Sequence, residues 1–541
     1  MVREQTHKNK QRTGVLSGVF ILTVAGVLVK VLGFAYKVPL NSLLGDEMAN
    51  VNAAYAIYAL LYTAATAGVP GAISLSVSRA VALGDRRRIR LILMSSLAFL
   101  LSLGLFLSLG LAFLARPLAE MNSDGDSFLC ILAISPALFF TAVACVLRGY
   151  FQGFSDMRPT AVSQLIEALG KAALGLLLVF LSLERWGHSH ATAASLGVFA
   201  ITLGVALGAL YLLLSLPWRG RRLLQGVAEG KHTTERGREV FRSVFAVALP
   251  ITLTSAMMSL STLMDAQMMR PLLTRYYGDA SLAKAVYSDY STGAVTLYNL
   301  PAIFVAPLCT ALVPYVSAAL ARGEKRMVRH AMESTLSATS LVSLPCALGM
   351  SALASPLLSF VFRGDEDMAA HAGVLLSVLG ISVFFLALLM VTTSALQAIG
   401  KERLPILSLA VGLLAKLVFM APLVALFGKV GVPLSTLLFF LLVCSLNFYF
   451  VRKETGVRIR MADTFLRPTL CALLSALSAL LAFSILARRW SSDLSLLVAI
   501  PVAVLVYGFA LLFTRAVSKT LVEKLPFGEK VLKRFERFFS P

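Results

Sequence analysis

Charged residues are scarce in this chain of 541 residues. Asp, Glu, Lys and Arg make up only 14% of it, whereas a soluble globular protein carries roughly 25%. Hydrophobic residues account for 58%, and the mean hydropathy is +0.80. Because no soluble core of this size needs so much apolar sequence, the composition predicts an all-α polytopic membrane protein.

Cysteine and histidine are also few, with six of each, and they are scattered along the chain. No CxxC pair or Cys/His cluster occurs, so neither a disulfide framework nor a metal site is indicated, and no cofactor is predicted. The chain also lacks a P-loop, a GxSxG nucleophile with triad partners, an HExxH helix and paired catalytic carboxylates. These absences disfavour an enzyme, including an ATPase or a glycosyl or phosphoryl transferase. Any transport is then driven by an ion gradient, by the membrane potential or by the downhill path of the substrate.

Long apolar runs are abundant. A membrane span needs roughly 20 apolar residues, and fourteen runs of the sequence meet that length. Their predicted positions are 14–38, 50–78, 91–115, 127–149, 160–183, 191–216, 244–270, 291–320, 331–361, 370–397, 405–427, 430–451, 465–487 and 493–514.

The net charge is +21, and the distribution of the basic residues along the chain fits a membrane topology. When the N-terminus is placed inside, most Lys and Arg residues fall in cytoplasmic connections, as the positive-inside rule requires. Both termini are therefore predicted to be cytoplasmic. The basic balance indicates orientation and contact with anionic membrane lipids, and it removes any need for a nucleic-acid partner.

Internal repetition predicts two lobes. Ser78–Arg90 aligns without gaps on Ser317–Arg329, and Gln152, Arg158 and Lys171 fall on Gln397, Arg403 and Lys416. Because these matches lie six spans apart, the two lobes should have the same orientation in the membrane. The predicted parts are an N-lobe at 1–217, a cytoplasmic linker at 218–243, a C-lobe at 244–455, a span pair at 456–518 and a basic tail at 519–541. The tail is either an amphipathic helix on the inner membrane surface or a solvated segment.

The stretch Gly149–Leu174 carries the strongest candidate site. Gln164, Glu167 and Lys171 lie at i, i+3 and i+7, which places them on one face of an apolar helix. A charge at membrane depth costs about 2.5–3.5 kcal/mol, so intramembrane ionisable residues are functional candidates. The alternative is a structural ion pair, because Glu167 precedes Lys171 by four residues.

The other ionisable residues deep in spans are Lys30, Asp265 and Lys416, and Arg79 and Arg270 lie near span ends. This interior is more basic than acidic and suits an anionic substrate such as a phosphate or pyrophosphate. The alternative for the two lysines is that they extend along their helices to the membrane surface. The carboxylate of Asp265 either pairs with a lysine of the other lobe, binds a coupling cation or forms a simple helix-to-helix ion pair.

Four stretches together resemble one family. They are GYFQGFSDMRPTAVSQLIEALGK at 149–171, AGVPGAISLSVSRAVALGD at 67–85, LVKVLGFAYKVPL at 28–40 and LYNLPAIFVAPLCTALVPYVSAALARGE at 297–324. They are similar to the polysaccharide-transporter and lipid-flippase branch of the multidrug/oligosaccharidyl-lipid/polysaccharide exporter superfamily. Within that branch the chain most resembles the Gram-positive lipid II flippases and the stage V sporulation protein B group.

The resemblance implies a fourteen-span, two-lobe exporter of the bacterial cytoplasmic membrane with a central cationic cavity. The implied cargo is an undecaprenyl-pyrophosphate-linked oligosaccharide, with the peptidoglycan precursor lipid II as the favoured case. On the matching positions, Lys30 and Lys171 would face the pyrophosphate, and Gln164 and Glu167 would shape the same face. Asn299, in the stretch that resembles the eighth span, completes the substrate-binding candidates.

The sequence also departs from this family. Lysine stands at positions 30 and 171, where arginine is usual, so a bidentate phosphate clamp becomes a point charge. Tyr36 occupies a position where some lipid II flippases carry a second arginine, and Lys37 is one residue away on a different face. The alternatives are an exporter of another lipid-linked polysaccharide, a drug or cation antiporter of the same fold, and a non-transporting scaffold that partners the cell-wall or sporulation machinery.

Overall fold

Helices make up all of the regular structure that the computed structural model describes, which covers residues 24–120, 127–225, 227, 237–321, 323–362, 366–456 and 462–514. The predicted all-α class is confirmed for these residues. The start of the first predicted span, most of the predicted linker and the basic tail at 519–541 lie outside the described residues, so nothing is said of their structure.

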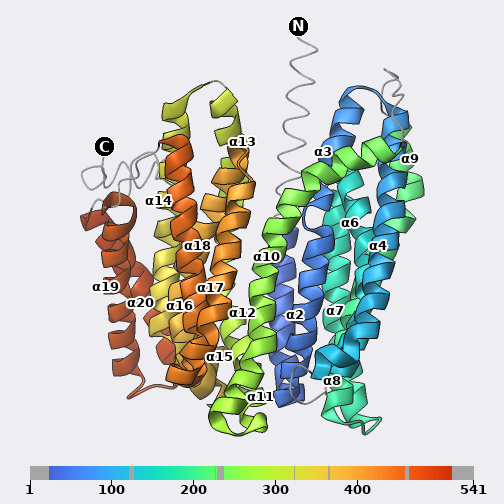
Figure 1. Cartoon of the computed structure of the whole chain (residues 1–541). Helices are drawn as coiled ribbons and strands as arrows, with labels where there is room; N and C mark the ends of the chain where they lie inside the picture. The colour runs from blue at the N-terminus through green and yellow to red at the C-terminus, as the bar shows by residue number, and fades with distance from the viewer. Residues whose placement is uncertain are drawn as a thin grey trace. The chain divides into compact units, whose positions relative to one another are not determined.

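The chain packs as two units, and each is described by itself. Unit 1 comprises Met1–Pro271 and Ala283–Ser288. Its first helix is described over residues 24–44. The elements that follow in unit 1 (Figure 1) are η1 (Gly45–Glu47), α2 (Met48–Thr66), α3 (Val69–Ala82), α4 (Arg86–Glu120), α5 (Phe128–Ile134), α6 (Ala137–Gly153), α7 (Arg158–Glu184), α8 (His190–Ser215), the π-turn η2 (Leu216–Gly220), α9 (Arg221–Gln225) and most of α10 (Gly237–Tyr277).

Unit 2 comprises Leu272–Leu282 and Asp289–Pro541, so that α11 (Ala280–Asp289) contributes to both units. In Figure 1 its helices run from yellow-green to red along the chain. They are η3 (Tyr290–Ala294), α12 (Val295–Tyr298), α13 (Ala302–Ala321), α14 (Lys325–Ala352), α15 (Ala354–Val361), α16 (Glu366–Ala398), α17 (Arg403–Phe427), η4 (Gly428–Val430), α18 (Gly431–Thr455), η5 (Ala462–Leu466), α19 (Arg467–Leu486) and α20 (Ser492–Phe513).

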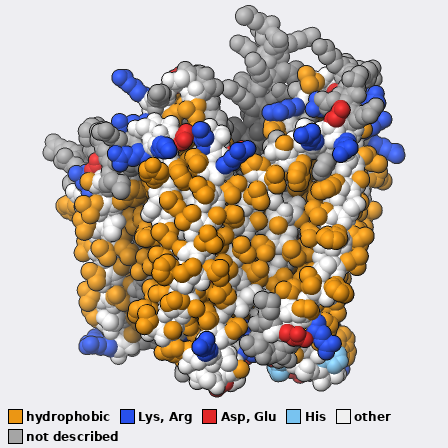
Figure 2. Space-filling view, viewed as in Figure 1, with side chains coloured by type: hydrophobic (Ala, Val, Ile, Leu, Met, Phe, Trp, Pro, Cys, Tyr) orange, Lys and Arg blue, Asp and Glu red, His pale blue; other side chains and the backbone are white. Residues whose placement is uncertain are grey.

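Ten helical runs of the described residues are long and apolar enough to cross a membrane, and α10 makes eleven if its bent halves form one span. The runs Val24–Val81 and Arg403–Thr455 each cover two predicted spans, because a short 3-10 turn separates two helices in each. The predicted span 291–320 is not among these runs, although its second part forms α13, which has 20 residues. It is divided into η3, α12 and α13, with Pro301 at the second break. Figure 2 shows hydrophobic side chains over the middle of the helices and Lys and Arg mainly toward their ends, as a membrane protein requires.

The packing units do not divide the chain where the sequence analysis placed its lobes. The boundary predicted from the sequence is the linker 218–243, whereas α10 belongs to unit 1 as far as Pro271. The two units are defined by packing between helices, whereas the predicted lobes are defined by repetition in the sequence. The units therefore do not test the five predicted parts, which stay a prediction.

Local interactions of the residues between α6 and α7 determine where α7 begins. Ser155 has a φ of 61°, which ends the turn after α6. The carboxylate of Asp156 then accepts a hydrogen bond from the Arg158 backbone N–H at 3.3 Å, and Pro159 occupies the first turn of α7, where its missing N–H costs nothing. These residues define the register that places Gln164, Glu167 and Lys171 along the helix.

Two helix breaks meet inside unit 1. Helices α2 and α3 are separated at Gly68, and α10 bends by 45° next to Ala248. The bend has a local cause, because Pro250 has no N–H to donate to the carbonyl four residues earlier. The Gly68 N–H donates instead to the Thr252 hydroxyl at 3.0 Å, and a Cβ at position 68 would lie 2.2 Å from the Ala248 carbonyl oxygen.

Gly68→Ala is therefore expected to lower the free energy of unfolding by about 1–3 kcal/mol, the usual cost of overpacking a well-packed contact. Equilibrium unfolding of the purified protein in detergent measures the change. Gly71→Ala is the matched control, because a Cβ at that helical position would have no neighbour within 4 Å. Equal stabilities of the two variants would contradict the proposed close contact.

Candidate functional site

The backbone of α7 is held against α8 by two glycines. A Cβ on Gly204 would lie 2.7 Å from the Glu167 carbonyl oxygen, and one on Gly208 would lie 2.9 Å from the Ser163 carbonyl oxygen. Gly204 and Gly208 form a GxxxG pair, a pattern that lets two membrane helices approach closely. The segment of α7 that carries Glu167 and Lys171 is therefore fixed by backbone contact.

Lys171 points from α7 toward the first helix. A Cβ on Gly33 would lie 4.0 Å from its Nζ, and the centre of the Tyr36 ring is 5.8 Å from the same atom. An ammonium over an aromatic face within about 6 Å is attracted by the ring quadrupole. The tyrosine is itself held in place, because its hydroxyl donates to the Gly197 carbonyl at 3.4 Å. Lys171 is thus a positioned cation.

Three lysines line up where these helices meet. Lys30, Gly33 and Lys37 are at i, i+3 and i+7 and share one face of the first helix. Because the ammonium of Lys171 lies beside Gly33, it falls between the two lysines of that face. Lys37 is close enough to Lys171 for their charges to interact, and it also donates to the Asn52 side chain at 3.4 Å. We call Lys30, Lys37 and Lys171 the cationic strip.

Glu167 pairs with an arginine of another helix. The Arg148 guanidinium, on α6, donates from Nη2 to the Glu167 carboxylate at 2.8 Å and from Nε to the Ser163 hydroxyl at 3.0 Å. Only 9% of the Arg148 side chain and 31% of the Glu167 side chain are exposed. Among the described residues, no carboxylate lies within ion-pair distance of Lys171. Glu167 is therefore paired with Arg148 and not with Lys171.

Sequence reasoning missed two of these residues. Arg148 was absent from the candidates because it lies at the very end of the predicted span 127–149, although an arginine after the apolar run ALFFTAVACVL was a visible signal. Lys37 was set aside because it is on a different face from Tyr36. The structure confirms that difference, and it also places Lys37 on the face of Lys30.

Tyrosines of α2 accompany this site. Tyr55, Tyr58 and Tyr62 follow one helical face, with ring centres 5.9 and 5.7 Å apart in succession. Tyr58 shares a hydrogen bond of 3.1 Å with the Thr141 hydroxyl, and Tyr55 remains 45% exposed. All three rings are close enough to interact with the Glu167 charge. They form an aromatic row beside the carboxylate, in which Tyr58 is buried and Tyr55 is exposed.

Two other predicted residues lie on α10. The Arg270 guanidinium is buried and donates to the Asn50 side chain at 3.3 Å. Asn50 in turn donates to Glu47, which also accepts from Lys284 at 2.8 Å. Asp265 is 8% exposed. The structure thus ties Arg270 to the start of α2.

The remaining predicted residues are dispersed. In unit 1, Arg79 is exposed near the end of α3, and Gln164 is half-buried one turn before Glu167. In unit 2, the Asn299 side chain is exposed and donates to the Val295 carbonyl of its own segment at 2.8 Å. Lys416 has no exposed surface, and its ammonium donates to the Thr436 hydroxyl at 3.0 Å and lies 5.9 Å from the Phe439 ring centre.

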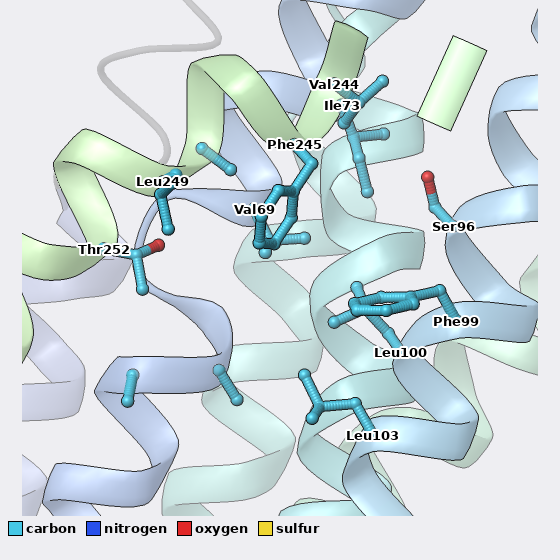
Figure 3. Close-up of a pocket in the computed structure, with 13 residues that line it drawn as sticks. Val69, Ile73, Ser96, Phe99, Leu100, Leu103, Val244, Phe245, Leu249 and Thr252 are labelled. Carbon is cyan, nitrogen blue, oxygen red and sulfur yellow. The ribbon is translucent and has the colours of Figure 1, made fainter. Parts of the chain in front are cut away.

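A pocket of about 230 Å³ lies where the two helix breaks of unit 1 meet (Figure 3). Val69 of α3, Phe99 of α4 and Phe245 of α10 surround it, and Ser96 and Thr252 are its only polar residues among those described. Its wall is thus apolar and without charge. Among the described residues, no group of three or more His, Cys, Asp or Glu side chains is arranged to hold a metal ion.

The fold and the basic site are consistent with a membrane transporter, and the matching families are transporter families. A sequence profile described as polysaccharide biosynthesis protein matches residues 15–320, and a profile described as MatE matches residues 250–421. The chain belongs to the polysaccharide biosynthesis protein family, within the multidrug/oligosaccharidyl-lipid/polysaccharide exporter superfamily. The resemblance found in the sequence is confirmed at this level.

Individual proteins are similar to the chain over most of its length. Lipid II flippase MurJ of Bacillus subtilis (strain 168) is 25% identical over 478 residues, 85% of this chain and 86% of that protein. Stage V sporulation protein B of the same organism is 26% identical over 536 residues, 96% of this chain and 99% of that protein. A solved structure of lipid II flippase MurJ in an inward closed conformation aligns with a TM-score of 0.67 and 15% identity, covering 91% of this chain and 98% of that one. That last likeness shows the fold alone.

Proposed function

We propose that this transporter is a flippase that moves an undecaprenyl-pyrophosphate-linked oligosaccharide from the inner to the outer leaflet of the bacterial cytoplasmic membrane. The observation that carries the proposal is the cationic strip, in which Lys171 lies beside Gly33 between Lys30 and Lys37. Three ammonium groups at membrane depth match a pyrophosphate better than a neutral or cationic cargo.

The neighbours of the strip support an anionic cargo. Because Arg148 neutralises Glu167, that carboxylate does not cancel the charge of Lys171. We infer that Lys30 and Lys171 contact the pyrophosphate, that Lys37 adds to the same field, and that Gln164 and Glu167 shape the site. The exposed ring of Tyr55 on α2 is a suitable surface for the sugar. Arg79, Asp265, Arg270, Asn299 and Lys416 stay predicted contributors, as does a coupling ion.

The proposed mechanism is alternating access between two lobes of the same orientation. The cytoplasmic location of both termini is part of this proposal and comes from the positive-inside rule. Lipid II is the first candidate cargo, because a lipid II flippase is among the relatives, and another lipid-linked sugar is the alternative. A drug or cation antiporter of the same superfamily is less consistent with a strip of three lysines.

Depletion of the protein in its native cell tests this function. The expected result is accumulation of a polyprenyl-pyrophosphate-linked oligosaccharide on the cytoplasmic side, identified by mass spectrometry of extracted lipids. Re-expression of the wild-type chain should clear the lipid, whereas Lys171→Gln should not. The sugar that accumulates identifies the cargo.

Two outcomes would contradict the proposal. The first is an unchanged pool of polyprenyl-linked sugars after depletion. The second is a loss of resistance to cationic drugs with that pool unchanged, which would favour the antiporter.

A further inference from the structure

A second pocket of unit 1, of about 400 Å³, combines charge with an apolar wall. It lies where residues 24–28 of the first helix, the start of α7, the end of α8 and η2 come together. Its polar side chains are Arg158, Arg219 and Tyr211, and the rest of the wall consists of Val24, Ala25, Leu28, Ala161, Val162 and Leu165.

The two arginines come from separate elements and face the same space. Arg158 is the first residue of α7, and Arg219 belongs to η2, some sixty positions later in the chain. Neither guanidinium forms an ion pair with another described residue. Two arginines and a tyrosine beside a largely apolar pocket suit a phosphate that is joined to an acyl chain, because arginine binds phosphate oxygens in a bidentate manner.

The apolar wall continues from the arginines along the helices. Leu28 is 47% exposed and Val162 is 37% exposed, so the pocket is open at the side of unit 1. Trp218, next to Arg219, is 84% exposed. Exposed tryptophans of membrane proteins gather at the level of the lipid headgroups. The arginines therefore lie at headgroup depth, and the leucines and valines lie where acyl chains begin.

This pocket is separate from the cationic strip. Successive residues of an α-helix are about 100° apart, so Leu28 and Lys37 point about 180° apart on the first helix. On α7, Val162 and Lys171 also differ by about 180° by the same rule. The pocket and the strip thus use opposite faces of the same two helices.

We propose that this pocket is a binding site for an anionic phospholipid of the membrane. The lipid phosphate binds between Arg158 and Arg219, and one acyl chain runs along Leu28, Val162 and Leu165. The pocket of Figure 3 provides the contrast, because its uncharged wall offers no partner for a headgroup. A bound lipid would hold the first helix against α7, and its binding does not depend on what cargo the transporter carries.

A phospholipid is favoured over the cargo for two reasons. The pocket faces away from the cationic strip, and phospholipids surround the protein at a concentration that no minor lipid reaches, which favours their binding by mass action. Anionic lipids are attracted to basic residues near the membrane surface by about 1 kcal/mol for each residue. The two arginines together therefore favour an anionic phospholipid over a zwitterionic one.

The test uses the full-length protein in phosphatidylcholine vesicles that contain a small fraction of phosphatidylglycerol with a photoreactive acyl chain. After illumination, labelled peptides are identified by mass spectrometry. We expect the label on the peptides of residues 24–28 and 161–165. Arg158→Gln/Arg219→Gln should reduce labelling roughly fivefold for each arginine, the ratio that corresponds to about 1 kcal/mol. Arg158→Lys/Arg219→Lys should restore part of it.

Matched controls separate the site from general effects. Arg116→Gln/Arg185→Gln removes two exposed arginines elsewhere in unit 1 and should leave the labelling unchanged. Leu28→Trp fills the pocket and should reduce labelling, whereas Leu169→Trp, at a similarly exposed position of α7 outside the pocket, should not. Only variants that elute as a single folded species are compared.

Three results would overturn the proposal. One is equal labelling by the phosphatidylglycerol probe and by its phosphatidylcholine analogue. Another is labelling that the Arg158→Gln/Arg219→Gln variant does not reduce. The third is displacement of the probe by a trace of polyprenyl pyrophosphate, which would identify the occupant as the cargo and not as a membrane phospholipid.

Discussion

Glu167→Ala is expected to lower the free energy of unfolding by about 3 kcal/mol. The substitution leaves the Arg148 guanidinium, only 9% exposed, without its carboxylate at 2.8 Å. Removing one partner of a buried pair typically costs 3–5 kcal/mol, because the other charge stays buried and uncompensated. We place the cost at the lower end, since 31% of the Glu167 side chain is exposed. Equilibrium unfolding of the purified protein measures it.

The double variant Arg148→Met/Glu167→Leu is the control for this prediction. Apolar replacements of a buried ion pair are often neutral or stabilising, so most of the lost stability should return. Lys171→Met should have a smaller effect than Glu167→Ala, because the lysine is not the partner of that carboxylate. If Lys171→Met and Glu167→Ala are equally destabilising, the helical pair Glu167–Lys171 is the structural one and our assignment is wrong.

Lys171→Gln is expected to reduce transport of the lipid-linked cargo about 10- to 150-fold while the amount of protein in the membrane stays the same. A hydrogen bond to a charged group contributes about 1.5–3 kcal/mol, which corresponds to that range. The measurement is the rate at which the sugar of a polyprenyl-pyrophosphate oligosaccharide becomes accessible on the far side of proteoliposomes, divided by the amount of reconstituted protein.

Lys171→Arg is the conservative variant and should keep most of the activity, because it retains the positive charge at this position. Normal transport per molecule with poor accumulation of Lys171→Gln would assign the lysine a structural role. Lys416→Gln is the repeat-related comparison. Lys416 has no exposed surface. An unchanged transport rate in Lys416→Gln would confine the proposed site to unit 1.

Much of the fold could be predicted because it depends on properties that are additive along the chain. Apolar runs of span length predicted the helices of both units, and all but one of the predicted spans overlap an observed candidate run. The exception, 291–320, contains Pro301, Pro307 and Pro314. Hydropathy averages over such a segment and is insensitive to the break at Pro301, whereas Pro307 and Pro314 lie within the continuous helix α13.

The site was predicted less completely than the fold. Gln164, Glu167 and Lys171 were recognised because helical spacing places them on one face. The partner of Glu167 was not recognised, because Arg148 lies on another helix and its position depends on how α6 packs against α7. A local pair at i, i+4 is visible in the sequence, whereas a tertiary pair has no such signal.

The sequence by itself determined the membrane class and the family, because composition, motifs and span length depend only on the order of residues along the chain. Only the tertiary structure decided which charges are neutralised. It did so through close backbone contact, with Gly204 and Gly208 holding α7 in place and Gly33 leaving room for Lys171 on the face of Lys30 and Lys37. Electrostatic pairing acts over a few ångströms in space, and that proximity exists only once the helices have packed.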